Sequence, residues 1–493
     1  MSSRKFNEYK GLDLPQLGRE VLEVWDRENT FGRSITEREG APAFIFYEGP
    51  PSANGLPGIH HVLSRTIKDT ICRYKTQQGY LVRRKAGWDT HGLPVELGVE
   101  KKLGITKEDI GHKISIEEYN RTCREAVMEF TGVWEELTRK MGYWVDMKHP
   151  YITYENKYIE TLWWMLKQLF DKGLLYKGYT IQPYSPAAGT GLSNHELNQP
   201  GCYRDVKDTT CTAQFEIIRD ERSEFLFDDA QGTLYFLAWT TTPWTLPSNT
   251  ALAVGDNIEY VRVKCLNPYT QQPQTVILAK ELLPAYFTPK MEGTYSIGER
   301  IYKGSELVGI RYRQLIDWVK PMGDAFRVIS GDYVTTVDGT GIVHIAPTFG
   351  ADDDRVGKQA GIVPMYVVDR AGKNQPMVDR RGRLFRIEDM DPDFVAKYVD
   401  AERYREWAGR FVKNAYDPSL GPDDPTLDID IAVMLKGEGK AFKIEKHTHS
   451  YPHCWRTDKP VLYYPLDSWF IRTTALRERL MELNDTIDWK PAS

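Results

Sequence analysis

Two adjacent histidines, His60 and His61, follow a loop rich in glycine and proline that runs from Gly49 to Gly58. A short apolar run, Ala43 to Tyr47, precedes the loop and has the length of a buried strand, and the histidines stand at the start of a helical pattern. The backbone N–H groups of such a loop and the N-terminus of the following helix favour an anion. The spacing therefore predicts a phosphate-binding site, to which the histidines add hydrogen-bond donors.

Three segments of this region also carry a family resemblance. The loop reads G-P-P-S-A-N-G from Gly49, the following helix carries K-D and R-Y at positions 68–69 and 73–74, and G-W-D-T-H-G-L-P-V-E runs from Gly87 to Glu96. These segments resemble the nucleotide-binding core of the class I aminoacyl-tRNA synthetases, and within that class the isoleucine-specific enzymes of the eukaryote-like type also found in some bacteria. The resemblance implies activation of isoleucine with ATP and Mg²⁺ and its transfer to tRNA(Ile). The substrate- and ATP-binding residues that it implies are Gly49, Pro50, Pro51, Asn54, Gly55, Gly58, Trp88, Asp89 and His91.

The helix start departs from the family signature, which is H-x-G-H. Here it reads Gly58-Ile59-His60-His61, so the first histidine and the glycine have changed places. The resemblance makes His60 and His61 the catalytic donors, although only His61 stands where the family has a histidine, and a surface position is the alternative for either one. A side chain at position 60 would crowd the adenine unless the loop shifts into the room vacated at Gly58, which is our hypothesis for the exchange.

The segment from Gly87 to Glu96 implies the amino-acid pocket. Asp89 resembles the family aspartate that holds the α-ammonium group of the substrate, because a buried ammonium must be paired. Trp88 and Pro50 are expected to wall the side-chain pocket. The alternative for Asp89 is a turn residue, since glycines flank it at positions 87 and 92.

A second site is expected because an apolar pocket discriminates poorly against one missing methylene, by about 10- to 200-fold, isoleucine against valine being the standard example of this limit. The segment Thr240–Asn249 matches the threonine-rich editing peptide of the family, and Gly341–Pro347 with Gly350–Asp354 matches the opposite wall. A strand with a polar face and a solvated acidic loop are the alternatives for these two peptides. The resemblance implies a hydrolytic role for Thr240, Thr241, Thr242, Thr245, His344 and Asp353, in which Asp353 anchors the amino group of the mischarged amino acid.

The expected fold class is α/β, a Rossmann-type parallel-sheet catalytic domain split by a β-rich editing insertion. The expected parts are an N-terminal helical arm (1–40), the first part of the catalytic domain (41–200), the insertion (201–441) and the return into the catalytic domain (442–493). Short β-runs at Ala213–Ile218, Thr233–Thr240, Glu259–Cys265, Thr275–Ala279 and Gly341–Ile345 indicate the insertion.

Hydrophobic periodicity supplies the remaining elements. Helices are predicted over residues 12–30, over His60–Gln78, over one long stretch from Ser115 to Met141, and over Glu155–Phe170. The residues of the second helix expected to face the core are Leu63, Ile67, Ile71 and Tyr74. The core stripe expected on the last helix consists of Tyr158, Leu162, Trp163, Leu166 and Phe170. Strands are predicted over Tyr80–Lys85 and Leu174–Gln182.

Composition restricts the remaining choices. The net charge of −5 gives no global signal for nucleic acid, and six scattered cysteines without a C-x-x-C pair argue against a disulfide framework and a zinc ribbon. The residue types of a zinc site occur at His447, His449, His453 and Cys454. The family has a structural segment here, so we expect no metal site in this chain. Zinc stays possible in a full-length enzyme. With no apolar signal segment and no apolar run of about 18 residues, we expect a cytoplasmic monomer without a membrane span.

The chain carries no K-M-S-K-S sequence, the family loop that holds the ATP phosphates, and we expect it to be the N-terminal fragment of the ligase. Two alternatives stay open. One is a stand-alone deacylase that acts only in trans editing, and the other is a regulatory module that binds nucleotide or tRNA.

Overall fold

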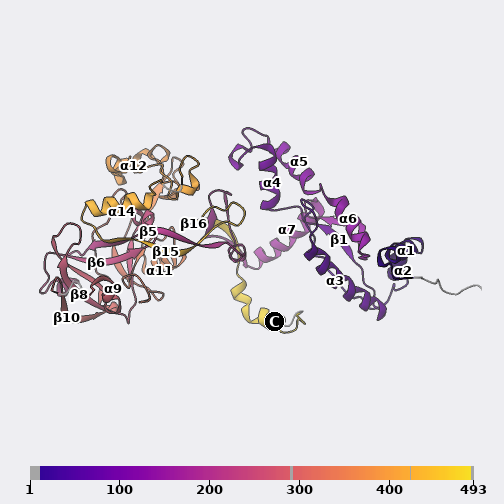
Figure 1. Ribbon diagram of the computed structural model, residues 1–493, viewed down its shortest axis with the longest axis horizontal. Helices are drawn as coiled ribbons and strands as arrows, with labels where there is room; N and C mark the ends of the chain where they lie inside the picture. Colours follow the sequence, from indigo (N-terminus) through magenta and orange to yellow (C-terminus); the bar gives the residue numbers. More distant parts are fainter. Residues whose placement is uncertain (1–10, 289–292, 422–423, 490–493) are drawn as a thin grey trace, which may run out of the picture. The chain divides into compact units, whose positions relative to one another are not determined.

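The computed structural model describes residues 11–288, 293–421 and 424–489 (Figure 1). The chain divides into two compact units, the first formed by Met1–Tyr176 with Ile471–Ser493 and the second by Lys177–Phe470. The predicted domain limits at 201 and 441 stay predictions. In the described ranges no helix is both long and apolar enough to cross a membrane.

The N-terminal part of unit 1 is helical. Helix α1 (Leu14–Arg27) is capped by Asp13, whose carboxylate accepts the Gln16 amide at 3.0 Å, and α2 (Thr30–Thr36) follows. Trp25 of α1 packs edge-on against Trp144 at 5.2 Å between ring centroids, so the predicted arm packs on the rest of unit 1.

The sheet of unit 1 has two strands, β1 (Lys85–Trp88) and β2 (Asp146–Ile152), which pair in parallel. The strands predicted at Ala43–Tyr47 and Tyr80–Lys85 are wrong as placed, since these segments share only one parallel bridge, Ala43 with Leu81. Beyond that bridge the side chains of the first segment alternate, with Phe44 and Phe46 half-buried while Ile45 is 73% and Tyr47 is 87% exposed. Regular pairing begins only where the Asp146 amide donates to the Arg84 carbonyl at 2.8 Å, which moves the strand toward Trp88.

Helix α3 (Ile59–Gln77) forms where predicted and ends before Gly79, whose φ of +95° suits glycine. The predicted buried face is wrong. Its apolar residues are exposed, Leu63 by 63%, with Ile67, Ile71 and Tyr74 on the same face. The buried face is polar instead, because Arg65 donates to the Thr138 hydroxyl and Asp69 pairs with the buried Arg84 at 3.0 Å.

Four helices follow in unit 1: α4 (Leu93–Leu103), α5 (Ile116–Val127), α6 (Thr131–Lys140) and α7 (Asn156–Asp171), with a 3₁₀ turn η1 (Lys107–Asp109). The single helix predicted from Ser115 to Met141 is wrong, because it breaks before Thr131, where the Phe130 amide donates to the Ala53 carbonyl at 3.0 Å. The predicted helix start at Ser115 is confirmed, since the Ser115 hydroxyl accepts the Glu118 amide at 3.1 Å.

Helix α7 contradicts its predicted core stripe. No residue of α7 is buried, and Trp163 is 67% exposed. After unit 2 the chain returns to unit 1 as η8 (Thr473–Leu476) and α15 (Arg477–Asn484).

Unit 2 is rich in strands. A six-stranded sheet has the order β10-β8-β9-β6-β5-β15 and is antiparallel except for the parallel pair β6–β9. Its strands are β5 (Tyr203–Glu216), β6 (Thr233–Thr240), β8 (Glu259–Leu266), β9 (Pro273–Ala279), β10 (Ser296–Lys303) and β15 (Ala441–Pro452). A three-stranded sheet, β11-β7-β12, uses Arg327–Ser330, Ala251–Val254 and Ile342–Ile345. The predicted β-runs of this region and the predicted strand near Leu174 are confirmed.

Smaller elements complete unit 2. One small sheet consists of β16 (Leu462–Ile471), β3 (Leu175–Ser185) and β4 (Thr190–Gly191), and another of β13 (Tyr366–Val368) and β14 (Asn374–Pro376). The helices are α8 (Asn194–Leu197), α9 (Leu283–Tyr286), α10 (Gly304–Leu307), α11 (Ala351–Ala360), α12 (Pro392–Tyr398), α13 (Ala401–Tyr404) and α14 (Leu427–Gly437). The 3₁₀ turns are η2 (Glu224–Leu226), η3 (Pro243–Ser248), η4 (Lys280–Leu282), η6 (Ile387–Asp389) and η7 (Asn414–Tyr416).

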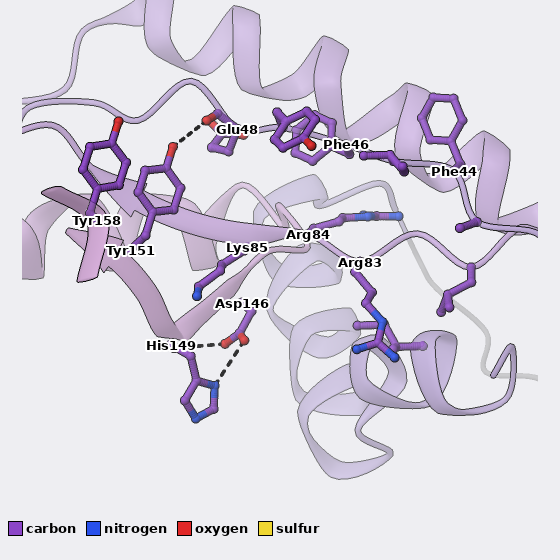
Figure 2. A pocket seen from close by; sticks show the side chains of 15 residues that line it. Phe44, Phe46, Glu48, Arg83, Arg84, Lys85, Asp146, His149, Tyr151 and Tyr158 are labelled. Carbon is purple, nitrogen blue, oxygen red and sulfur yellow. Dashed lines mark hydrogen bonds and ion pairs between the residues drawn. The ribbon is translucent and has the colours of Figure 1, made fainter. Parts of the chain in front are cut away.

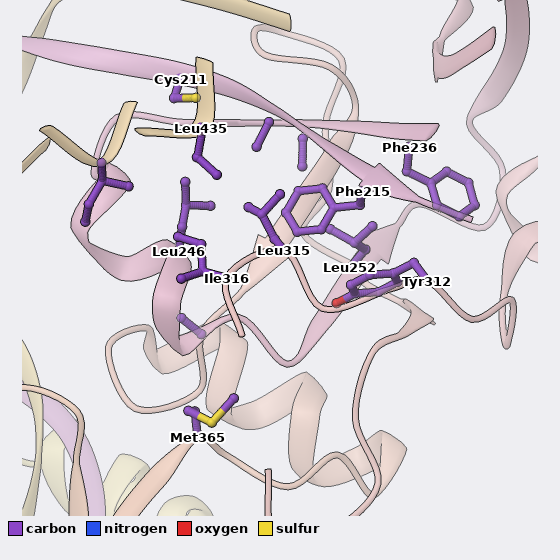
Figure 3. Packing of buried hydrophobic residues seen from close by; sticks show 14 of the residues in the cluster. Cys211, Phe215, Phe236, Leu246, Leu252, Tyr312, Leu315, Ile316, Met365 and Leu435 are labelled. Carbon is purple, nitrogen blue, oxygen red and sulfur yellow. The ribbon is translucent and has the colours of Figure 1, made fainter. Parts of the chain in front are cut away.

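The core of unit 2 joins these layers. Phe215 and Phe236 from the large sheet, Leu252 from the small sheet, Leu246 from η3 and Leu435 from α14 belong to one buried cluster (Figure 3). The turn η3 is buried along its whole length, so its backbone is fixed by the core on which it lies.

Candidate functional site

The glycine loop of unit 1 is anchored through its carbonyl groups. The Pro51 carbonyl accepts the Asp89 amide at 3.0 Å, and the Gly55 carbonyl accepts the Trp134 indole N–H at 2.9 Å. In the described part of the chain, no group accepts a hydrogen bond from the amides of Asn54 or Gly55. Those two N–H groups are therefore available to an anion.

His61 caps the helix that follows. Its Nδ1 accepts the Gly58 amide at 2.9 Å, so in the neutral ring the proton is on Nε2, which can donate to a ligand. Burial, and then the neighbouring His60 and Arg65, lower the pKa of His61, which keeps the ring neutral at pH 7. His60 is exposed and lies 3.8 Å from His61 between ring centroids.

The exchanged histidine occupies the space beside Gly58. A Cβ atom on Gly58 would meet His60 Cε1 at 2.7 Å and His60 Nδ1 at 2.9 Å. Real Cβ atoms do not approach other atoms so closely, so His60 would have to move if position 58 carried a side chain. The φ of Gly58 is −101°, which any residue can adopt, so the restriction comes from this contact alone.

Asp89 supplies a carboxylate to the predicted amino-acid pocket. The residue is half-buried, and among the described residues its Oδ1 accepts a hydrogen bond from the His91 amide alone, at 3.4 Å. His91 is exposed and its Nδ1 lies 2.8 Å from the Thr153 hydroxyl. Trp88 is buried in a cluster with Ala53 and Trp134, so it supports the loop from behind.

A cavity of about 1040 Å³ lies beside the loop, and the sequence did not indicate it (Figure 2). The predicted ATP-binding residues do not line it; its walls come from residues 43–48, from Arg83, Arg84 and Lys85, and from Asp146, His149, Tyr151 and Tyr158. Glu48 at its edge is buried, accepts Lys68 Nζ at 2.6 Å and the Tyr143 hydroxyl, and receives the Tyr151 hydroxyl on its backbone carbonyl at 2.8 Å. The available signal was an acid between the apolar run and Gly49, with a lysine on the next helix.

The threonine-rich peptide of unit 2 begins at the end of β6 and continues into η3. The Thr240 hydroxyl accepts the Thr242 amide at 3.1 Å, and the Thr242 hydroxyl lies 3.4 Å from that of Thr240 and 3.5 Å from that of Thr245. Thr241 is half-buried in the same turn. Three hydroxyl groups are therefore collected in one small volume.

His344 of β12 joins this group. The Thr245 hydroxyl donates its only proton to the Thr242 carbonyl at 2.8 Å, so at 3.1 Å His344 Nε2 must be the donor to Thr245. Nδ1 is then a bare acceptor, and it has no partner in the described residues. Burial lowers the pKa of His344 to about 4, so the ring is neutral at pH 7.

Asp353 lies in the first turn of α11. Its Oδ2 accepts the Ala346 amide at 2.9 Å and its Oδ1 accepts the Tyr333 hydroxyl at 3.0 Å. Part of the residue reaches solvent, but its carboxyl group is enclosed, and this burial raises its pKa to about 6 against the lowering effect of the two hydrogen bonds.

The two walls of this site are joined by an aromatic contact. Trp244 of the threonine peptide packs edge-on against Phe349, which directly precedes the acidic segment, at 5.0 Å. The structure thus brings Thr240, Thr242, Thr245 and His344 into one hydrogen-bonded group, and fixes Asp353 on the segment that follows.

A buried charge cluster supports the threonine peptide. No local sequence pattern indicated it, because its members are far apart along the chain. Asp428 of α14 accepts the Trp244 amide at 2.8 Å and lies 3.5 Å from Lys413 Nζ. Lys413 also lies 3.1 Å from Asp208 of β5, which His449 of β15 approaches at 3.3 Å. The cluster ties η3 to two neighbouring strands.

The histidines considered for zinc have other partners: His449 approaches Asp208, and His453 Nδ1 lies 3.0 Å from the Tyr451 carbonyl. Across the residues that the structure describes, no group of three or more His, Cys, Asp or Glu side chains is arranged to hold a metal ion.

Comparison with known proteins places the chain in a family. Residues 20–493 match the model of the class I tRNA synthetases for I, L, M and V, so the chain belongs to this family of class I tRNA synthetases. It is 64% identical to the isoleucine–tRNA ligase of Bacteroides fragilis and 63% identical to that of Porphyromonas gingivalis, over 100% of this chain and 44% of each relative. The chain thus spans less than half the length of these relatives. A solved structure described as GlLeuRS-CP1 is 14% identical and covers 48% of this chain and 99% of its own, with a TM-score of 0.32, too low to carry an argument.

Proposed function

We propose that this chain forms the nucleotide- and amino-acid-binding part of an isoleucine–tRNA ligase, together with a hydrolytic site that clears valine from tRNA(Ile). The observation that carries the proposal is the group of Thr240, Thr242, Thr245 and His344 beside a separately held Asp353, on a chain 64% identical to an isoleucine–tRNA ligase. The proposal includes ATP, isoleucine and tRNA(Ile) as ligands, and a monomer in the cytoplasm.

In the synthetic reaction, the isoleucine carboxylate attacks the α-phosphate of ATP, and pyrophosphate leaves. Catalysis requires positioning and donors around the phosphates. The free amides of Asn54 and Gly55 and Nε2–H of His61 supply such donors, and Asp89 has the acceptor capacity to hold the substrate ammonium. Mg²⁺ would arrive bound to the ATP phosphates, where it neutralises charge.

In the hydrolytic reaction, Asp353 binds the ammonium of the mischarged amino acid, and the threonine hydroxyls position the ester and a water molecule. His344 is too weak a base at a pKa of about 4 to remove a proton from water at neutral pH. Its role is to fix the Thr245 hydroxyl, so hydrolysis at this site depends on alignment.

The test is to measure ATP–pyrophosphate exchange with isoleucine and deacylation of Val-tRNA(Ile) side by side, in the full-length protein and in Asp353→Ala. We expect the wild type to carry out both reactions and the variant to lose deacylation while exchange stays unchanged. Deacylation by the variant at the wild-type rate would refute the assignment of Asp353. A wild type that deacylates without exchange would be a trans-editing deacylase, and one that does neither would be a binding module.

A further inference from the structure

Asp353 is held by two donors from two different segments. The Ala346 amide, just after β12, binds Oδ2 at 2.9 Å, and the Tyr333 hydroxyl, from the loop after β11, binds Oδ1 at 3.0 Å. A carboxylate has about four acceptor positions, so these bonds occupy one on each oxygen and leave two for a substrate ammonium. The two donors thus fix the plane of the carboxylate without filling it.

We propose that Tyr333 is a positioning residue of the hydrolytic site, whose hydroxyl holds Asp353 as an oriented anion ready for the substrate ammonium. This inference rests on the proposed function for its biological meaning. Its chemical content, control of the Asp353 carboxylate by Tyr333, does not depend on that function.

Tyr333 is suited to this role because it remains a donor at every relevant pH. Burial and the adjacent Asp353 raise the pKa of Tyr333, so its hydroxyl keeps its proton. The ring is half-buried and fixed beside α11, so the hydroxyl approaches Asp353 from outside the helix. No residue on α11 itself supplies a comparable bond to Oδ1 within the described chain.

The other charged groups around Asp353 are paired or neutral, and of these Asp352 still adds to the raised pKa of Asp353. Asp352 and Asp332 both bind Arg355, at 3.1 Å and 2.6 Å, and Asp354 binds Lys358 at 2.6 Å. His344 of β12 is neutral near pH 7. Tyr333 is therefore the side chain on which the ionisation of Asp353 depends most directly.

The first test compares Tyr333→Phe with the wild type in Val-tRNA(Ile) deacylation between pH 5.5 and 8, using the full-length protein and subtracting spontaneous hydrolysis. Loss of one bond to a charged group should raise the Asp353 pKa by about one unit above 6. Because kcat/KM reports the free enzyme, the ratio of wild type to variant should be about 5 at pH 6 and close to 1 at pH 8. A purely structural role predicts a loss that is the same at every pH, and that result would overturn the proposal.

The matched control is Tyr404→Phe, which removes a buried hydroxyl that donates to the Phe385 carbonyl at 2.8 Å and, among the described residues, makes no hydrogen bond to a carboxylate. It should leave the pH profile of deacylation unchanged. A shift in the control equal to that of Tyr333→Phe would also overturn the proposal.

The second test is independent of the reaction and uses thermal unfolding at pH 5 and pH 8. The folded-state pKa of Asp353 is already above its unfolded value, so its contribution to stability is lost as pH rises through about 6. The higher pKa in Tyr333→Phe enlarges that loss, so the difference in Tm from the wild type should be greater at pH 8 than at pH 5. Equal differences at both pH values would refute the inference, even if the wild-type protein showed no deacylase activity. A wild type without deacylation but with the expected Tm pattern would refute only the proposed function.

Discussion

Replacing Lys413 by methionine should destabilise the fold, because the charge of Lys413 supports the threonine peptide. The lysine is enclosed, with 12% of its side chain exposed, and its Nζ lies between Asp208 at 3.1 Å and Asp428 at 3.5 Å. Methionine preserves most of the volume and removes the charge, so the two carboxylates would face each other without a cation. Removing one member of a buried ion pair costs about 3–5 kcal/mol.

The expected cost depends on pH, because the two carboxylates differ. At Asp208 burial alone would raise the pKa, but Lys413 and His449 outweigh it and the pKa lies below its usual value. At Asp428 burial is stronger than the more distant Lys413 and raises the pKa to about 6. Asp428 is therefore mostly protonated at pH 5 in the wild type, where Lys413 stabilises only Asp208. In the variant the folded-state pKa values of both carboxylates rise, which lowers the free energy of unfolding at pH values above their unfolded-state pKa. We therefore expect the full loss of about 3–5 kcal/mol at pH 8 and about half of it at pH 5.

Calorimetry of the wild type and Lys413→Met at pH 5 and pH 8 measures this difference. Lys443→Met is the matched control, because Lys443 is an exposed lysine paired with the exposed Glu445 at 3.0 Å, and such pairs contribute only about 0–1 kcal/mol. An equal decrease of the unfolding temperature at both pH values would refute the role of the carboxylates. A decrease no larger than that of the control would refute the importance of the cluster.

Two further predictions concern single contacts. Gly58→Ala should weaken ATP–pyrophosphate exchange by roughly three- to tenfold, since overpacking costs on the order of 1 kcal/mol. Adding His60→Gly to the same protein should restore exchange, because His60 is the group that the new Cβ meets at 2.7 Å. Failure of the double variant to recover would contradict the steric explanation. Exchange in Gly58→His with His60→Gly tests whether the two arrangements are interchangeable. Thr245→Val should lower deacylation of Val-tRNA(Ile) about tenfold without changing exchange, because it leaves the His344 Nε2–H without its acceptor, whereas unchanged deacylation would separate His344 from the reaction.

The sequence predicted unit 2 well because its strands are marked locally. Runs such as Thr233–Thr240 combine β-branched and aromatic residues between turns, and the structure has β6 with these bounds. In unit 1 the same reasoning found helices but assigned their faces wrongly. Periodicity identifies an apolar face, as at Leu63 or Trp163, and says nothing about what covers it.

The candidate sites show the same division. Contiguous motifs placed Thr240, Thr245, His344 and Asp353 in the sequence, and Thr240 and His344 lie on strands that the pattern had already indicated. Residues that act through long-range contacts could not be found this way. Tyr333 reaches Asp353 from another loop, and Lys413 joins groups from strands and a helix that only the fold brings together.

The pairing of β5 with β15 has a consequence for synthesis of the chain. Tyr203 pairs with Pro452 and Ala213 with Ala441, so one edge of β5 has no partner until the ribosome has made residues far later in the sequence. At about 5–20 residues per second this open edge persists for on the order of ten seconds or more. Unpaired strand edges invite association with other chains, and charged side chains oppose it. The alternation of Arg204, Asp205, Lys207 and Asp208 along the first half of β5 places charge on the strand during the interval in which a nascent chain would be most prone to aggregate.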